Sequence, residues 1–244
     1  SLNLKALDSL LNYSSITSDL SVFKEINKLK PGHILSYKID QLSQNVEPNI
    51  TQWWNYESLV NASISNQIKD EKEALRELES VLRCSIRQQS YSDVPIGCFL
   101  SGGIDSSLIA SIFSQEFGSK INTFTVGFDD DRYDESRKAA KVANYLGTNH
   151  SEIILDSKDA LSIIPSLPEI YSEPFADTSQ IPTFLVCRSA KQSGLTVALT
   201  GDGGDELFAG YVRHFMTPWA WKRLRYIPRP IRYSLGQIIE NLPI

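Results

Sequence analysis

The stretch from residue 70 to residue 199 alternates between amphipathic segments and short apolar runs, which constrains the fold more than any other feature. The apolar runs predict strands at 94–100, 122–128, 151–155 and 195–199. Helical spacing and end signals predict helices at 70–89, 106–117, 134–146, 157–164 and 179–193. Strands that alternate with helices form parallel sheets through right-handed crossovers. We therefore predict an α/β fold, a doubly wound, mostly parallel sheet with helices on both faces.

A glycine-rich segment lies between the first predicted strand and the following helix. It reads Phe99-Leu100-Ser101-Gly102-Gly103-Ile104-Asp105-Ser106-Ser107. Glycines allow main-chain N–H groups to approach an anion closely, and a helix N-terminus adds partial positive charge. Ligands of parallel sheets bind beyond the carboxyl ends of the strands, where this segment is expected. The segment therefore predicts an anion site that suits phosphate oxygens.

Two familiar loop types do not fit this segment. A Walker A loop requires Lys after the glycines, and none follows Gly103. A hydrolase nucleophile elbow requires Gly two residues before the serine, where Phe99 stands. A helix cap without any ligand remains an alternative, since serine commonly caps helices.

A second glycine-rich segment follows the fourth predicted strand and is acidic. It runs Thr200-Gly201-Asp202-Gly203-Gly204-Asp205-Glu206-Leu207-Phe208-Ala209-Gly210-Tyr211. An Asp within a phosphate site implies a cation, so we interpret Asp105 as a Mg²⁺ ligand and Asp205 as its partner across the site. Asp202 is the candidate contact for a substrate amine or for incoming ammonia. A solvated acidic loop is the alternative interpretation of this segment.

Together these segments resemble the asparagine synthetase family. Ser101-Gly102-Gly103-Ile104-Asp105-Ser106 matches the SGGxDS pyrophosphate loop of the N-type ATP pyrophosphatases, a superfamily with an adenine nucleotide alpha hydrolase-like fold. Phe124–Phe128 with Tyr133-Asp134-Glu135, the segment Ser172–Asp177, and the loop Gly201–Tyr211 are similar to three further segments of the glutamine-hydrolysing asparagine synthetases. The resemblance covers about residues 70–211 in the family's order.

The resemblance implies a role for each matching residue. It places Leu100, Val126 and Gly201 around adenine and ribose, with Gly102 and Thr200 also in the nucleotide site. It places Ser101, Gly103, Ser106 and Ser107 on the pyrophosphate. It implies Mg²⁺ on Asp105 and Asp205, and Asp202 as a catalytic residue together with these two. Asp202 stands where many members have Glu and the β-lactam enzyme has Tyr, so the substrate stays open.

The implied activity is ATP-dependent formation of asparagine from aspartate and ammonia, with AMP and pyrophosphate as products. Two alternatives remain: a ligase for another carboxylate, such as a β-lactam precursor or a sugar acid, and a non-catalytic nucleotide-binding fragment.

The resemblance also implies how the chain is divided into domains. Residues 1–57 look like the end of the family's glutaminase domain and its linker, with a strand predicted at 34–39 and a polar loop at 40–52. Residues 58–244 look like the ATP-binding domain, with an incomplete helical region after Tyr211. We expect a part of a longer protein.

Composition excludes several other classes of function. The net charge of −5 does not suit a general nucleic-acid binder, which needs a basic face. Three widely spaced cysteines predict neither a zinc site nor a disulfide framework. No apolar run reaches transmembrane length. We expect a cytoplasmic protein, with a homodimer as one option for its assembly. The resemblance implies that its ammonia comes from the glutaminase domain of the same full-length chain.

Overall fold

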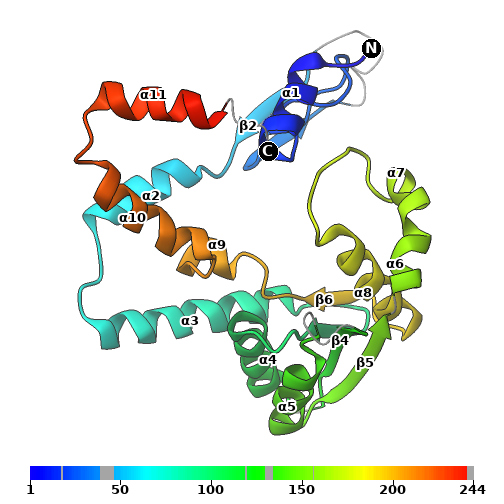
Figure 1. Ribbon diagram of the computed structural model, residues 1–244. Helices are drawn as coiled ribbons and strands as arrows, with labels where there is room; N and C mark the ends of the chain where they lie inside the picture. The colour runs from blue at the N-terminus through cyan, green and yellow to red at the C-terminus, as the bar shows by residue number, and fades with distance from the viewer. Residues whose placement is uncertain (18, 39–46, 119, 130–133, 156, 241–244) are drawn as a thin grey trace.

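The centre of the molecule is a parallel sheet. The computed structural model describes residues 1–244 except 18, 39–46, 119, 130–133, 156 and 241–244. Its sheet contains β3 (Ile96–Phe99), β4 (Asn122–Phe128), β5 (Asn149–Leu155) and β6 (Val197–Leu199). These strands pair in the order β5-β4-β3-β6, and each pair is parallel (Figure 1). The four predicted strands are confirmed.

Helices cover both faces of this sheet. One face packs against α3 (Glu71–Gln89), α4 (Ile104–Phe117) and α5 (Ser136–Leu146). The other face packs against α6 (Ser157–Ile163), the 3₁₀ turn Ile164–Ser166, α7 (Leu167–Ile170) and α8 (Gln180–Gln192). Alternate residues of a strand point to opposite faces. Cys98 and Leu100 accordingly join the first core, and Phe99 joins the second. The predicted doubly wound fold is confirmed.

The helix ends follow the sequence signals. The Asp70 carboxylate accepts a hydrogen bond from the Glu73 N–H at 2.8 Å and caps α3. Gly147 ends α5 in the left-handed conformation. Arg83 and Arg87 of α3 both form ion pairs with Glu116 of α4, which ties these two helices together. The helix that begins at the first glycine segment, α4, is therefore linked to α3 by these ion pairs.

The N-terminal region contains more regular structure than the sequence predicted. It holds α1 (Leu4–Tyr13), β1 (His33–Ser36), β2 (Asn49–Gln52) and α2 (Tyr56–Ser65). The prediction of a polar loop through residue 52 is wrong at its end, because β2 pairs with β1 in an antiparallel hairpin. Residues 40–46 of that predicted loop lie outside the described residues. The predicted domain boundary after residue 57 falls within α2 and stays a prediction.

The C-terminal region is helical, and α10 (Val212–Leu224) and α11 (Arg229–Glu240) lie after Tyr211, where the family resemblance implied helices. A short helix that was not predicted, α9 (Gly204–Phe208), lies within the second glycine segment. Several of its arginines stack on aromatic rings rather than extending into solvent alone. The Arg223 guanidinium, for example, lies 3.7 Å from the centre of the Trp219 ring. Among the described residues, every helix is too short or too polar to span a bilayer.

Candidate active site

The first glycine segment forms a tight turn organised by serine hydroxyls. The Ser106 hydroxyl lies 2.9 Å from that of Ser101 and accepts a hydrogen bond from the Ser101 N–H at 3.1 Å. The Gly103 N–H donates to the Ser101 hydroxyl at 3.2 Å. Gly103 is the N-cap of α4 and provides no side-chain cap for it. The N–H groups of the first helical turn have no intrahelical partners, so they can serve an anion.

The backbone conformation and the close packing at position 102 both require glycine. Its φ of +75° lies in the left-handed region, which favours glycine. A Cβ atom there would lie 2.6 Å from the Lys138 Cβ and 2.8 Å from the Ala139 nitrogen, both in α5. The turn is therefore pressed against the start of α5, and a side chain at this position would separate the two.

The second glycine segment packs directly onto the first. A Cβ atom on Gly201 would lie 2.7 Å from the Ser106 nitrogen, and one on Gly204 would lie 2.5 Å from the Asp105 carboxyl carbon. The two glycines thus allow the β6–α9 loop to touch the N-terminus of α4. The structure brings the two predicted site segments together at the carboxyl ends of β3 and β6.

The three predicted acidic residues occupy different surroundings. The Asp105 carboxylate contacts Gly204, and the Asp202 carboxylate accepts a hydrogen bond from the Thr200 hydroxyl at 3.0 Å. The Asp205 carboxylate contacts Gly210, beyond the end of α9. The predicted meeting of Asp105 and Asp205 over one divalent ion stays a prediction.

Leu100 and Val126 lie on opposite faces of the sheet. Leu100 is 2% exposed, and its side chain belongs to the core under α4. Its carbonyl accepts a hydrogen bond from the Thr125 hydroxyl, and its N–H donates to the Phe124 carbonyl. Val126 packs with the cluster of Ile163 and Leu185 on the other face. The nucleotide contacts that the resemblance implies for these residues stay predictions.

A cavity of about 600 Å³ opens beside the junction of the two loops. Its polar wall contains Asp105, Thr200, Gly201 and Asp202, four of the predicted site residues. Its apolar wall comes from α3, α4 and α9, with lining residues that include Leu78, Leu82, Ile104, Leu108, Leu207 and Phe208. These apolar residues were not among the predicted site residues, although the helical spacing of apolar residues in α3 is a signal that could have pointed to them.

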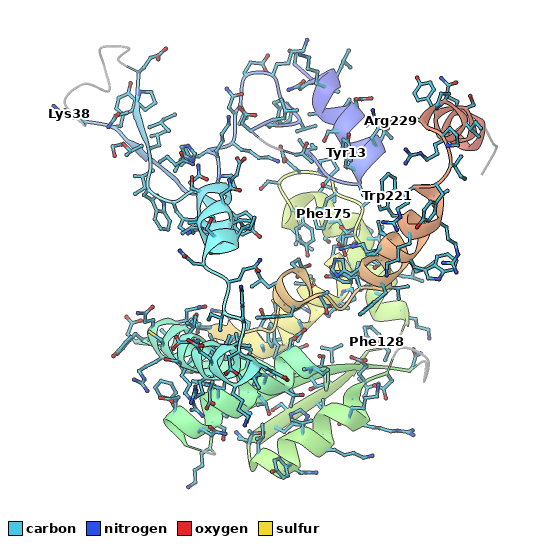
Figure 2. All side chains as sticks on the ribbon, turned by 90° about the vertical axis from the view of Figure 1, so that its left-hand side faces the viewer. Tyr13, Lys38, Phe128, Phe175, Trp221 and Arg229 are labelled. Atoms are coloured by element: carbon cyan, nitrogen blue, oxygen red, sulfur yellow. The ribbon has the colours of Figure 1, made fainter. Side chains whose placement is uncertain are left out.

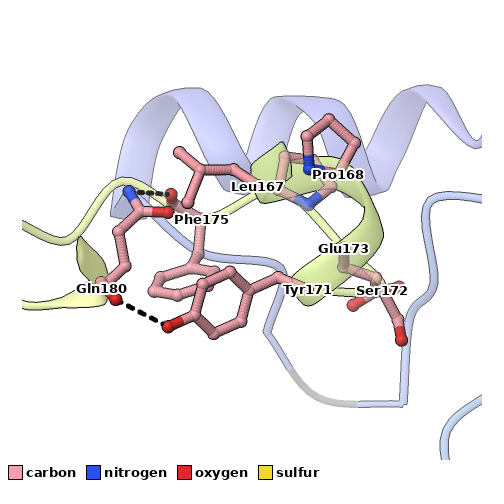
Figure 3. Close-up of a pocket in the computed structure, with 8 residues that line it drawn as sticks. Leu167, Pro168, Tyr171, Ser172, Glu173, Phe175 and Gln180 are labelled. Carbon is pink, nitrogen blue, oxygen red and sulfur yellow. Dashed lines mark hydrogen bonds between the residues drawn. The ribbon is translucent and has the colours of Figure 1, made fainter. Parts of the chain in front are cut away.

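A second, smaller cavity of about 350 Å³ lies at the turn between α7 and α8. Figure 3 shows the rings of Tyr171 and Phe175 in this pocket, where their centres are 4.9 Å apart in an edge-to-face arrangement. The Tyr171 hydroxyl donates to the Gln180 carbonyl at 2.7 Å and closes the turn. This pocket includes Ser172 to Phe175, part of the segment 172–177 singled out in the sequence.

The segment that precedes α5 is also close-packed. The Asp134 carboxylate accepts hydrogen bonds from both the N–H and the hydroxyl of Ser136, each at 3.1 Å, and these bonds hold its pKa below the usual value. A Cβ atom on Gly127 would lie 2.7 Å from the Asp134 carboxylate. Tyr133, part of the same sequence match, lies outside the described residues.

The carboxylates at the candidate site are of the ligand type that Mg²⁺ prefers. Mg²⁺ prefers oxygen ligands, and sites for Mg²⁺ with nucleotides commonly use one or two carboxylates, with waters and phosphates completing the shell. Asp105 offers a carboxylate beside the open N-terminus of α4. The described residues contain no group of three or more His, Cys, Asp or Glu side chains suited to a metal ion.

The fold and the joined loops define an α/β protein with a glycine- and serine-rich turn at the carboxyl edge of a parallel sheet. The sequence match is more specific, since residues 77–242 match the asparagine synthase family. The chain belongs to this family.

Several relatives align with most of the chain. A protein of Methanocaldococcus jannaschii is 32% identical over 233 residues, which are 95% of this chain and 42% of the relative. Asparagine synthetase [glutamine-hydrolyzing] 1 of Bacillus subtilis is 28% identical over 98% of this chain and 36% of its own length. Asparagine synthetase [glutamine-hydrolyzing] 2 of Lotus japonicus is 32% identical over 77% of this chain and 31% of its own length. The chain spans less than half the length of these curated relatives.

Proposed function

We propose that this chain is the ATP-binding part of an asparagine-forming ligase. The observation that carries the proposal is the contact of Gly201 and Gly204 with Ser106 and Asp105, which joins both glycine loops into one site. An open helix N-terminus, an adjoining carboxylate and membership of the asparagine synthase family support it. The proposed reaction converts aspartate, ATP and ammonia into asparagine, AMP and pyrophosphate.

The proposed chemistry follows from the weak electrophilicity of a carboxylate. An oxygen of the substrate side-chain carboxylate attacks the α-phosphorus of ATP, and the bond to pyrophosphate breaks. Ammonia then attacks the acyl carbon of the acyl-adenylate, AMP leaves, and one proton is released. The protein contributes position and charge rather than a covalent nucleophile.

Each residue of the site has a proposed part. The turn from Ser101 to Ser107 binds the departing pyrophosphate through main-chain N–H groups and hydroxyls. Asp105 and Asp205 would hold Mg²⁺, which neutralises negative charge on the phosphates. Asp202, held by the Thr200 hydroxyl, orients the amine of the substrate or the ammonia. Closure of the site against water protects the adenylate from hydrolysis.

The partners of the proposed enzyme follow from the relatives' names. Ammonia would come from glutamine, hydrolysed in a glutaminase domain of the same full-length chain. A cytoplasmic location and a homodimer are parts of the same proposal.

The test is ATP–pyrophosphate exchange by the full-length protein with a panel of carboxylic acids. We expect exchange that depends on aspartate and is lost in Asp105→Asn, which keeps the shape of the side chain while removing its charge. Exchange that depends on another acid would reassign the substrate. The absence of exchange with every acid of the panel, together with normal ATP binding, would instead support a non-catalytic nucleotide-binding role.

A further inference from the structure

The N-terminal segment, defined here as residues 1–30, is joined to the edge segment 171–179 by several contacts. The Val22 N–H donates to a Glu173 carboxylate oxygen at 3.1 Å, across 151 residues of sequence. The Lys28 ammonium forms an ion pair with the other oxygen of the same carboxylate. The Ala176 N–H donates to the Ser14 carbonyl at 2.7 Å. Figure 2 shows Phe175 close to the N-terminal helix that carries Tyr13.

Glu173 is the centre of these contacts. Its side chain is 21% exposed, and the Lys28 side chain is 37% exposed. Burial opposes ionisation of Glu173, but hydrogen bonds from Lys28, Val22 and Ser21 outweigh it and hold its pKa below the usual value. Lys28 also donates to the Ile16 carbonyl at 3.2 Å, so one ammonium group joins the edge segment to the interior of the N-terminal segment. A charged, partly buried pair of this kind restricts both segments.

The edge segment leads into the N-terminus of α8, and the direction of α8 relates it to the candidate active site. This helix leads into β6, so it runs antiparallel to the strands, and its N-terminus lies at their carboxyl edge. Just before this end, the Asp177 carboxylate accepts hydrogen bonds from the N–H and the hydroxyl of Ser179, the N-cap residue of α8, at 2.7 and 2.5 Å. Further along α8, burial and the nearby charge of Asp202 raise the pKa of Cys187. Ile181, Phe184 and Leu185 of α8 pack in one cluster with Val126 of β4. The edge segment is therefore connected through α8 to β4, whose Val126 is a predicted nucleotide contact.

We propose that Glu173 is a positioning residue through which the N-terminal segment holds the start of α8 and so sets the geometry of the nucleotide edge. The kinetic consequence of this inference rests on the proposed function. In a longer protein, the N-terminal segment would transmit the state of the preceding domain to the ATP site through this contact. The inference concerns coupling between segments and assigns no chemical step to Glu173.

The test uses Glu173→Gln, Lys28→Gln and the double variant in the full-length protein. Glu173→Gln retains an oxygen that can accept from Val22 while removing the charge that pairs with Lys28. Lys30→Gln is the matched control, because Lys30 lies in the same segment and pairs with Asp19 at 3.9 Å instead. The measurements are hydrogen–deuterium exchange of residues 171–182, and kcat and KM for aspartate-dependent ATP–pyrophosphate exchange.

We expect faster deuterium uptake in residues 171–182 for both single variants, with wild-type uptake in the control. We also expect kcat/KM for ATP to fall roughly tenfold, the size expected for a lost bond to a charged group. The double variant should be no worse than either single variant, because one contact is broken in all three. A merely structural role would lower thermal stability without changing kcat or KM of the folded fraction.

Two failures are distinguishable. Wild-type protein without aspartate-dependent exchange would overturn the proposed function, and deuterium uptake would still decide whether Glu173 holds the edge segment. Active wild-type protein, with Glu173→Gln and Lys28→Gln behaving like Lys30→Gln in both measurements, would overturn the positioning role. Additive effects in the double variant would also overturn it.

Discussion

Gly204 contacts the carboxylate of Asp105 so closely that a Cβ atom on Gly204 would lie 2.5 Å from the Asp105 carboxyl carbon. The atoms in the way belong to the end of a flexible side chain, which can rotate. At Gly201 the atoms in the way are main-chain atoms of Asp105 and Ser106, with the Ser106 nitrogen at 2.7 Å. The same substitution should therefore have different consequences at these two glycines.

Gly204→Ala should impair function and spare stability. The added methyl group displaces the Asp105 carboxylate, so we expect at least a tenfold loss of pyrophosphate exchange, with the free energy of unfolding within about 1 kcal/mol of wild type. Gly236→Ala is the control, because Gly236 lies in α11 with nothing within 4 Å of the added atom. Unfolding in urea and exchange kinetics provide the two measurements, and wild-type kinetics would contradict the role given to this contact.

Gly201→Ala should impair stability. The methyl group would meet the main chain at the start of α4, which can yield only by separating the loops. We expect a loss of about 1–3 kcal/mol in the free energy of unfolding, as for other overpacked sites. Urea denaturation of both alanine variants side by side measures the difference. Equal stability of the two variants would show that the loops are not packed as described.

Comparing Gly102→Ala with Gly194→Ala should distinguish the cost of backbone strain from the cost of steric contact. Both have positive φ, +75° and +85°, but only Gly102 faces close atoms, since an added Cβ at Gly194 meets nothing within 4 Å. Gly194→Ala should cost about 1–2 kcal/mol from the left-handed conformation. Gly102→Ala carries this cost and the contact with α5, so its unfolding midpoint in urea should be lower. A smaller loss at Gly102 than at Gly194 would argue against that contact.

His150 should make stability depend on pH. Burial lowers its pKa below 6.5, an effect that Glu152 partly opposes, and its Nδ1 lies 2.9 Å from the Thr123 hydroxyl. The unfolded chain binds a proton more readily, so this contribution is complete above pH 6.5 and is lost as the pH falls towards the folded pKa. His150→Gln should flatten the dependence of Tm between pH 7.5 and 5.5. His33→Gln, in the β1–β2 hairpin, is the control, and an unchanged slope in His150→Gln would contradict the prediction.

Cys98 should be unreactive in the folded protein. Its side chain is 0% exposed, and burial raises the pKa of its thiol to about 12. Cys84 and Cys187 are exposed, and all three cysteines are free thiols in this structure. Alkylation with iodoacetamide at pH 8, followed by peptide mass spectrometry, should label Cys84 and spare Cys98 until urea unfolds the protein. Labelling of both at equal rates would contradict the packing of β3.

The sequence by itself determined the features that depend on residues close together along the chain, namely the strands, the helices and the turns. The spacing of apolar residues predicted all four strands of the central sheet, and Gly147 marked the end of α5. The rule that ligands bind at the carboxyl edge of a parallel sheet predicted both glycine segments at the same edge. These features are readable because strand alternation, helix spacing and glycine turns are local properties of a chain.

The tertiary structure alone decided the contacts between distant segments. The ion pair of Lys28 with Glu173, the cavity between α3 and α9, and the placement of the Asp205 carboxylate against Gly210 have no local sequence signal. The strand at 49–52 was missed because it is short and polar, and its hydrogen bonds with β1 provide what its side chains do not. The physical reason is the same in each case. The periodicity of apolar residues specifies which face of a helix or strand is buried, whereas packing in three dimensions determines which other segment that face contacts.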